Sequence, residues 1–351
     1  AVGAIAVGVG HLHARDRHAH AYDGSAADSD AAADSVGPRI VDGDDDRVAA
    51  VGDNQYAGDT IAPGDTIIVA SGTYVGARIE KSGQPGAPKT LFTSSRVCRL
   101  NEPHATRAKH NAVLEIEGSA AEPVSYWIID GFTVDAVWRP SRCGCIDIRG
   151  TAGTSTTPGN PCHHITIRNC DISSSVGSGI SDSLHSYALY ENNYTSGNAE
   201  HGISHCNSSQ YATIRGNTSL YNGGSGFYND GNVSFGTPGV ISYALYEEQG
   251  VDNGAGAAIN CDGEAESIYR NNLLYDNHGA GISFYALNAA LGSKNNKVYN
   301  NTIVTPSDGD GGISIPSGAT PAQHSTVARL LYTSVVTEHA SKGAIAVAAP
   351  C

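Results

Sequence analysis

The chain reads HHITIRNCDISSSVGSGI at residues 163–180, and similar copies of this pattern follow up to residue 313. The next two copies are SYALYENNYTSGNAEHGI at 186–203 and QYATIRGNTSLYNGGSGF at 210–227. Aligned on the closing small–apolar pair, the copies place these residues in one column: Ile180, Ile203, Phe227, Ile259, Ile282 and Ile313. Their spacings of 23, 24, 32, 23 and 31 residues, with strand-length segments, predict a repeat in which each unit buries its apolar face against its neighbours.

A second column of the repeat carries amide side chains. Ten residues before the closing apolar residue the chain has Cys170, Asn193, Asn217, Gln249 and Asn272, and Asn301 lies twelve before the last one. Asparagines stacked at a bend can hydrogen-bond one another and the backbone. We therefore expect these asparagines to form a structural ladder.

A third column alternates in charge, and its members are Arg168, Glu191, Arg215, Glu247, Arg270 and Tyr299. Opposite charges on neighbouring strands attract by a few tenths of a kcal/mol to about 1 kcal/mol per pair. This pattern predicts a salt-bridge ladder rather than a catalytic arginine.

Composition limits the classes of partner. The chain has 351 residues with 42 glycines, and its 21 basic and 35 acidic residues give a net charge of −14. That charge disfavours nucleic acid and anionic membranes as partners, and it makes an acidic polysaccharide a harder ligand unless calcium or a basic patch intervenes. No apolar run is long enough for a membrane span.

The chain divides by composition into an entry segment and a repeat domain. Residues 1–60 are rich in Ala, Asp and His and are expected to be a partly irregular N-terminal cap, whereas 61–351 form the repeat domain. Residues 324–351 are expected to be a degenerate last coil. Cys143, Cys145 and Cys162 are candidates for a disulfide or, with His163, for a zinc site.

Three further segments carry a family resemblance: PGDTIIVASGTYVG at 63–76, YWIIDGFTV at 126–134 and RNNLLYDNHGAGISFY at 270–285. Together with the repeat they resemble the secreted right-handed parallel β-helix proteins of the pectate-lyase-like superfamily. The resemblance implies an all-β solenoid with coils of about 22–24 residues and an extracellular or cell-surface location. It does not fix the function, because this fold carries lyases, hydrolases, epimerases and structural fibres.

The strand that follows each closing pair is expected to present alternate side chains outward. The first outward column is Ser181, Ser204, Tyr228, Asn260, Ser283 and Ser314, and the second is Ser183, Cys206, Asp230, Asp262, Tyr285 and Pro316. The resembling enzymes bind an extended sugar chain along this face. We therefore expect Tyr228, Asn260 and Tyr285 to contact a polysaccharide.

Asp230 and Asp262 fall in one column of adjacent coils, about 5 Å apart by strand spacing. Two such carboxylates are candidate calcium ligands or an acid–base pair. The alternative is that each begins an Asp-Gly turn, in NDGN and CDGE.

Histidines are the candidates for proton transfer, namely His185, His201 and His205. In the resembling alginate epimerases and lyases a carboxylate and a histidine share this task, and Asp182-Ser-Leu-His185 is a loose counterpart. The alternation of side chains along this strand, however, places Asp182 and His205 inward, where an unpaired polar group costs about 1–3 kcal/mol.

The residues that are missing also bear on function. Lyases of the superfamily use a Lys or Arg base beside calcium-binding acids, and neither outward column contains one; nor do the NTD, GHG and RIK segments of its hydrolases occur. We expect a calcium-dependent polysaccharide lyase-like protein. The alternative is a structural or adhesive β-helix that self-associates end to end.

Overall fold

A computed structural model describes residues 39–42, 45–50, 61–95, 98–102, 112–136, 144–151, 159–207, 209–230, 241–242, 245–247, 250–252, 256–289, 291–316, 325, 327–331, 334–337 and 345–347. The chain divides into two units, Ala1–Ser35 and Val36–Cys351, and every described residue belongs to the second. All regular elements in these ranges are strands. Within the same ranges there is no helix of the length and apolarity that crossing a membrane requires.

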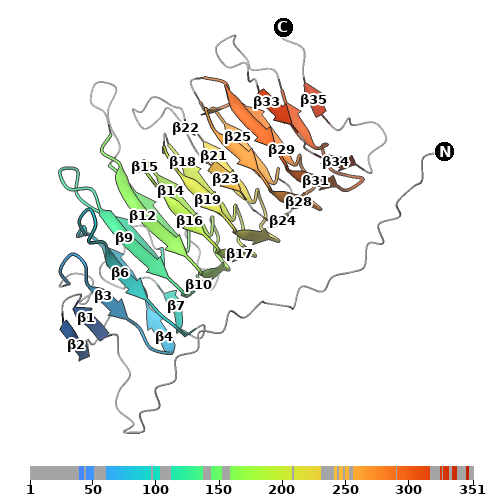
Figure 1. Cartoon of the computed structure of the whole chain (residues 1–351). Helices are drawn as coiled ribbons and strands as arrows, with labels where there is room; N and C mark the ends of the chain where they lie inside the picture. Colours follow the sequence, from blue (N-terminus) through green and yellow to red (C-terminus); the bar gives the residue numbers. More distant parts are fainter. Residues whose placement is uncertain are drawn as a thin grey trace. The chain divides into compact units, whose positions relative to one another are not determined.

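Three long sheets make up the second unit (Figure 1). Sheet A contains β1 (Arg39–Asp42), β2 (Asp45–Ala50), β3 (Thr66–Ile68), β6 (Lys89–Phe92), β9 (Ser125–Asp130), β12 (Cys162–Arg168), β15 (His185–Ser186), β16 (Leu189–Glu191), β19 (Thr213–Arg215), β23 (Leu245–Glu247), β27 (Ile268–Arg270), β30 (Asn296–Tyr299) and β33 (Val327–Leu331). Sheet B contains β4 (Gly72–Val75), β7 (Cys98–Glu102), β10 (Thr133–Asp135), β13 (Asp171–Ser173), β17 (Tyr194–Ser196), β20 (Thr218–Leu220), β24 (Gly250–Asp252), β28 (Leu273–Tyr275), β31 (Thr302–Thr305) and β34 (Ser334–Thr337). Sheet C contains β5 (Ala77–Ile79), β8 (Leu114–Glu117), β11 (Ile146–Arg149), β14 (Ile180–Ser183), β18 (Ile203–Cys206), β21 (Phe227–Asp230), β25 (Ile259–Asp262), β29 (Ile282–Tyr285), β32 (Ile313–Ile315) and β35 (Ile345–Val347). The short strands β22 (Ile241–Ser242) and β26 (Glu264–Ala265) pair with each other.

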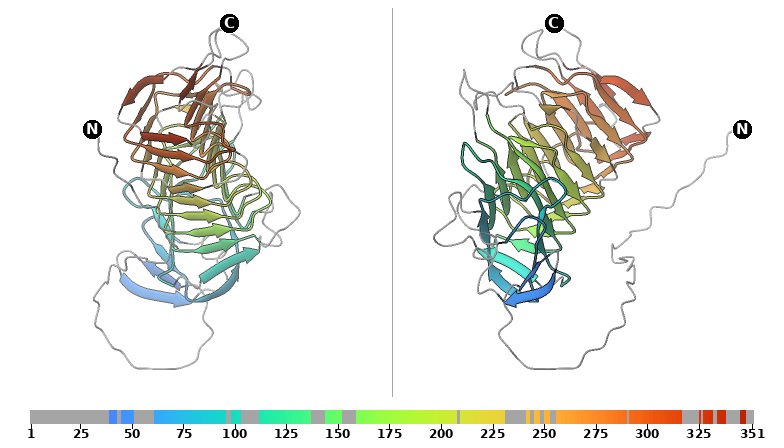
Figure 2. Two further views of the ribbon diagram at one scale, coloured as in Figure 1. Left: turned by 90° about the vertical axis from the view of Figure 1, so that its right-hand side faces the viewer. Right: turned by 60° about the vertical axis from the view of Figure 1, so that its left-hand side comes forward.

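Successive coils place one strand in each sheet, and from β3 onward the paired strands run parallel. Figure 2 shows the resulting stack of coils from two further sides. This arrangement is the right-handed parallel β-helix that the repeat and the resemblance predicted. In the entry segment, β1 and β2 form an antiparallel hairpin that pairs with β3, so sheet A begins before the predicted boundary at residue 60.

The closing column of the repeat is confirmed in sheet C. Ile180, Ile203, Phe227, Ile259, Ile282 and Ile313 are in register from β14 to β32. A glycine precedes each of them except Ile259, which follows Ala258, and at Gly179 and Gly281 the close approach of the next coil leaves no room for a side chain. A Cβ atom on Gly179 would lie 2.7 Å from the Gly202 carbonyl oxygen, and one on Gly281 would lie 2.6 Å from that of Gly312.

The asparagine ladder is also confirmed. The Asn217 Oδ1 atom accepts hydrogen bonds from the backbone N–H of Asn193 at 2.9 Å and from its side-chain amide at 3.0 Å. Asn272 donates to Asn301 in the same way, at 3.1 and 2.8 Å. These bonds satisfy backbone groups at buried bends, so the asparagines are structural.

The structure confirms that the residues of the charge ladder lie side by side on neighbouring strands, and it confirms some of the predicted ion pairs. Arg168, Glu191, Arg215, Glu247 and Arg270 pair in order along sheet A. The Arg215 guanidinium donates to Glu191 Oε1 at 2.6 Å, whereas Arg168 donates to Asp130 of the preceding coil at 2.8 Å.

The cysteine predictions concern residues near one insertion. Cys145 and Cys162 are both free and buried, which contradicts a disulfide between them. Cys143 lies outside the described residues.

Candidate functional site

The outer face of sheet C carries the residues predicted to contact a polysaccharide. Alternation along β21 and β25 buries Phe227, Asn229 and Ile259 and leaves Tyr228 and Asn260 half-buried on the outside. Tyr228 is in register with Asn260, and Asp262 with Tyr285. The predicted substrate-binding residues therefore lie on three adjacent strands, which are about 4.8 Å apart.

His201 and Tyr228 form the central contact of this face. Their rings stack with centroids 4.3 Å apart and planes inclined by 8°. The backbone N–H of Ser225 donates to His201 Nδ1 at 2.9 Å. Since Nδ1 accepts that hydrogen bond, the neutral ring carries its proton on Nε2. Burial lowers the pKa of His201 to about 4, so the ring is uncharged at neutral pH.

Tyr285 extends the site by one more strand. Its hydroxyl is hydrogen-bonded to that of Tyr228. Burial raises the pKa of Tyr228, and the nearby Tyr285 and Asp230 raise it further. Burial also raises the pKa of Tyr285, with Asp262 as the next contribution. Both hydroxyls therefore stay protonated at neutral pH, as hydrogen-bonding groups rather than bases.

Asp262 has a different environment from the one predicted for a calcium ligand. Asp230 and Asp262 are in register as expected. The Asp262 carboxylate, however, is fully buried and accepts the backbone N–H groups of Leu287, Asn288 and Ala289 at 2.7, 2.9 and 3.3 Å. It thus stabilises the loop after β29, and Asp230 is the acidic residue that reaches the half-buried outer face. No set of three or more His, Cys, Asp or Glu side chains suited to a metal ion occurs in the described part of the chain.

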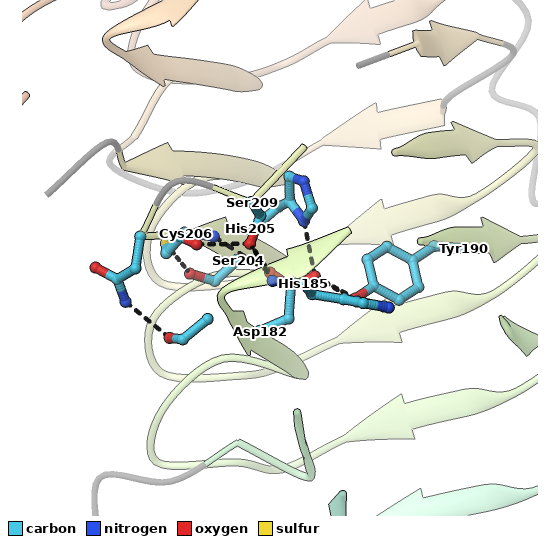
Figure 3. Close-up of polar contacts among 9 residues, drawn as sticks. Asp182, His185, Tyr190, Ser204, His205, Cys206 and Ser209 are labelled. Atoms are coloured by element: carbon cyan, nitrogen blue, oxygen red, sulfur yellow. Dashed lines mark hydrogen bonds and ion pairs between the residues drawn. The ribbon is translucent and has the colours of Figure 1, made fainter. Parts of the chain in front are cut away.

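A separate polar cluster lies inside the coils, centred on Asp182 (Figure 3). His205 Nδ1 lies 2.7 Å and His185 Nδ1 3.4 Å from Asp182 Oδ2, and the Tyr190 hydroxyl donates to the same oxygen. Oδ1 accepts the Ser209 hydroxyl at 3.2 Å and the Cys206 backbone N–H at 3.3 Å. The inward polar residues therefore pair with one another.

The protonation states of this cluster follow from its contacts. Burial alone would raise the pKa of Asp182, but the charge of His205 and the hydrogen bonds from His205 and His185 lower it overall. Burial opposes the charged form of His205, yet the Asp182 carboxylate raises the pKa of that imidazole. Burial lowers the pKa of His185. At pH 6.5 the cluster thus holds the Asp182 carboxylate and a mostly protonated His205 imidazolium, whose opposite charges offset each other.

The catalytic role predicted for His185 and His205 needs correction. Both rings are buried and face the interior, so neither contacts a polysaccharide on the outer face. The alternation of side chains along the strand predicted that His205 points inward, and the structure confirms this. His201, two residues before β18, is the predicted histidine that reaches the outer face.

Asp147 and Arg149 also belong to this face, although neither was among the residues predicted from the sequence. They are in register with Ser181 and Ser183 of the two outward columns. Arg149 Nε donates to Asp147 Oδ2 at 2.6 Å, and Asp147 is buried. The available signal was Gly144-Cys145-Ile146, which is an earlier copy of the closing pair.

Comparisons with known proteins identify the fold. Residues 159–328 match the model of the right-handed beta helix region. An alginate lyase from Paenibacillus sp. str. FPU-7 is structurally similar, with 13% identity, a TM-score of 0.50 and coverage of 84% of this chain and 94% of the lyase. A pectate lyase is similar with 14% identity, a TM-score of 0.50 and coverage of 82% and 73%. No curated protein sequence matches the chain. At these identities the likeness shows the fold.

Proposed function

We propose that this right-handed parallel β-helix protein of the pectate-lyase-like superfamily is carbohydrate-active and binds an extended polysaccharide along the outer face of sheet C. The observation that carries the proposal is the His201–Tyr228 stack, with Asn260 and Tyr285 beside it on neighbouring strands. Parallel strands of one sheet repeat such groups at a regular spacing, which suits a ligand that is itself a linear repeat.

The chemistry of these side chains also suits a sugar. An aromatic ring offers an apolar surface to the C–H groups of a sugar ring, while its hydroxyl bonds to sugar hydroxyls. Tyr228 and Tyr285 each have both properties, and Asn260 adds an amide that donates and accepts. A few placed polar groups among aromatic surface are typical of ligand sites.

Binding is supported better than the predicted lyase-like reaction. A lyase needs a base at the sugar and a means of neutralising the substrate carboxylate. His201 Nδ1 is occupied by the Ser225 N–H, and His185 and His205 face the interior. The lyase-like activity, its calcium dependence and the extracellular location therefore stay predictions.

The proposal is tested with a panel of neutral and uronic polysaccharides, measured by calorimetry. Replacing Tyr228 by Ala removes the stack and one hydroxyl, so we expect binding to weaken about 10-fold or more. Tyr221→Ala is the matched control, because Tyr221 is 70% exposed and directly follows β20 of sheet B, outside the outward columns of sheet C. Absence of binding to every polysaccharide of the panel would refute the proposal.

Lyase activity has a separate readout. Purified protein with calcium is assayed for unsaturated products on pectate, alginate and glycosaminoglycans. A rise in product absorbance that chelation abolishes would support the calcium-dependent lyase. No rise on any substrate would leave binding as the function.

End-to-end self-association is the alternative that one observation favours. The strand orders of the three sheets end at β33, β34 and β35, which expose Leu330, Val336 and Ile345. We expect sedimentation velocity to show concentration-dependent oligomers that Ile345→Lys abolishes, because Ile345 continues the buried column of Ile313 and is itself 44% exposed. A monomer at all concentrations would contradict this alternative.

A further inference from the structure

The proton of His201 is held in one place. Its Nδ1 atom accepts the Ser225 backbone N–H at 2.9 Å, and a backbone donor cannot reverse its role. The Tyr228 ring, stacked at 4.3 Å, fixes the plane of the imidazole. His201 therefore presents a hydrogen-bond donor at Nε2 and no lone pair for proton abstraction.

The described outward positions of the strands around His201 carry no lysine or arginine. The His201 ring itself is neutral because burial lowers its pKa to about 4. The outward positions of β14, β18, β21, β25 and β29 are described and contain no Lys or Arg, while Asp230 contributes a carboxylate. Arg149, on the same face of β11, already bonds to Asp147 at 2.6 Å. The described side chains of this face therefore offer a sugar carboxylate no cation beyond Arg149, which is bonded to Asp147.

A uronic acid chain would meet this face at a disadvantage. Its carboxylates would lose hydration beside Asp230 without gaining a cation among these positions. A neutral sugar carries hydroxyl and ring oxygens that accept hydrogen bonds without that cost. Donors at His201 Nε2 and the tyrosine hydroxyls match such oxygens.

We infer that the ligand of this face is an uncharged polysaccharide, and that His201 donates its Nε2–H to a sugar oxygen. The inference rests on the proposed function, since it names the class of sugar that the same site takes. It also makes His201 a specificity-determining residue and not a base.

The test compares calorimetric affinities for neutral glucans, mannans and galactans with those for pectate and alginate, each in EDTA and in calcium. We expect a neutral polysaccharide to bind equally in EDTA and calcium, with an affinity that is unchanged between pH 5.5 and pH 8. His201→Phe keeps an aromatic ring against Tyr228 and lacks the donor, so its binding should weaken about 2-fold to 12-fold, the worth of one hydrogen bond. His201→Gln, which can donate, should recover part of that loss. His278→Phe, at an exposed histidine paired with Asp308, is the control and should bind as wild type.

The outcomes separate the inference from the proposed function. Binding of uronic polysaccharides alone, or binding that requires calcium, keeps the function and overturns the inference. Wild-type affinity in a folded His201→Phe variant, verified by thermal unfolding, removes the role of the donor. No binding to either class overturns both.

Discussion

His201 and His205 are four residues apart and have opposite environments. His201 stacks on Tyr228 at the outer face of sheet C, where burial lowers its pKa to about 4. His205 points into the coils, where Asp182 at 2.7 Å raises its pKa in spite of burial. One histidine is a neutral donor for a ligand, and the other is a cation held by its own partner.

The difference shows how the two faces of one sheet divide structure from function. Inside, the Asp182 carboxylate accepts hydrogen bonds from Tyr190, His205 and Ser209, which lie 8 to 27 residues from it in the sequence, so this carboxylate is satisfied within the protein. Outside, the Ser225 N–H occupies Nδ1 of His201, so the ring proton is on Nε2, which we propose donates it to a ligand. Substitutions inside should therefore change stability, whereas substitutions outside should change binding.

The largest expected effect is that of Asp182→Asn. It leaves the His205 imidazolium buried beside a neutral amide, so we expect the free energy of unfolding to fall by about 3–5 kcal/mol. Urea unfolding at pH 7 measures the change. Asp308→Asn, at an exposed carboxylate, is the control and should be as stable as wild type. A loss below 1 kcal/mol would contradict a charged interior pair.

The pH dependence of that loss has a defined sign. The pKa of Asp182 is lowered on folding, so its contribution is present above the unfolded value and disappears as pH falls through the folded value. The pKa of His205 is raised above 6.5, so its contribution is full below 6.5 and disappears as pH rises through the folded value. The free energy of unfolding of the wild type should therefore fall at low pH and again at high pH. The Asp182→Asn variant should show neither of these two losses.

Glu264→Gln should reduce a second pH dependence of the interior. Burial raises the pKa of Glu264 from 4.5 to about 7, although Ser267 donates to it at 2.6 Å. Because folding raises the pKa of Glu264, the free energy of unfolding of the wild type is highest below pH 4.5. It falls by about 3 kcal/mol as the pH rises from 4.5 through the folded pKa of about 7. Urea unfolding from pH 4.5 to pH 8.5 should show a shallower slope in the variant. The exposed Glu266→Gln should keep the wild-type slope, and equal slopes in all three proteins would count against a buried neutral Glu264.

Tyr187→Ala tests a smaller contribution on the outside. Tyr187 stacks between His164 and Tyr211, with centroids 4.6 and 4.8 Å away. We expect a loss of about 1–2 kcal/mol, since each aromatic pair contributes about 0.5–1.5 kcal/mol. Tyr221→Ala is a close control, because Tyr221 has the same left-handed backbone, with φ 56° against 58°. Equal shifts in thermal unfolding for the two variants would show that the stack contributes nothing.

Arg215→Ala should have the smallest effect. Arg215 bonds to Glu191 at 2.6 Å, but its side chain is 45% exposed and solvent screens the pair. We expect a loss of about 0.2–1 kcal/mol in low salt that shrinks in high salt. Urea unfolding at two salt concentrations measures it. A loss above 2 kcal/mol that does not depend on salt would contradict this prediction, because the surface pair would then contribute about as much as the interior cluster.

Periodic features of this fold could be predicted from the sequence. The columns through Ile203 and Asn217 appear because one residue type returns at the coil length, and the structure confirms their registers. A second ladder, in which Asn198 Nδ2 donates to Asn222 Oδ1 at 2.8 Å, has the same 24-residue spacing and was readable in the same way.

The partners of individual polar residues could not be predicted. Asp182 in the inward column looked like a conflict, because its donors come from two coils and share no local pattern. Asp262 looked available because the backbone amides that bind it, from residues 287–289, depend on the path of a loop. Registers follow from spacing, but partners follow from three-dimensional packing.

The different states of the two histidines are tested most directly by an NMR titration of His201 and His205 in one ¹⁵N-labelled sample, assigned with His201→Gln and His205→Gln. We predict that His201 stays neutral with its proton on Nε2 down to a pKa of about 4, while His205 titrates above 6.5 and is therefore mostly charged at pH 6.5. We also predict that a bound neutral polysaccharide shifts the His201 resonances and leaves those of His205 unchanged. Two histidines that titrate together near 6.5, or a His201 protonated on Nδ1, would contradict these predictions.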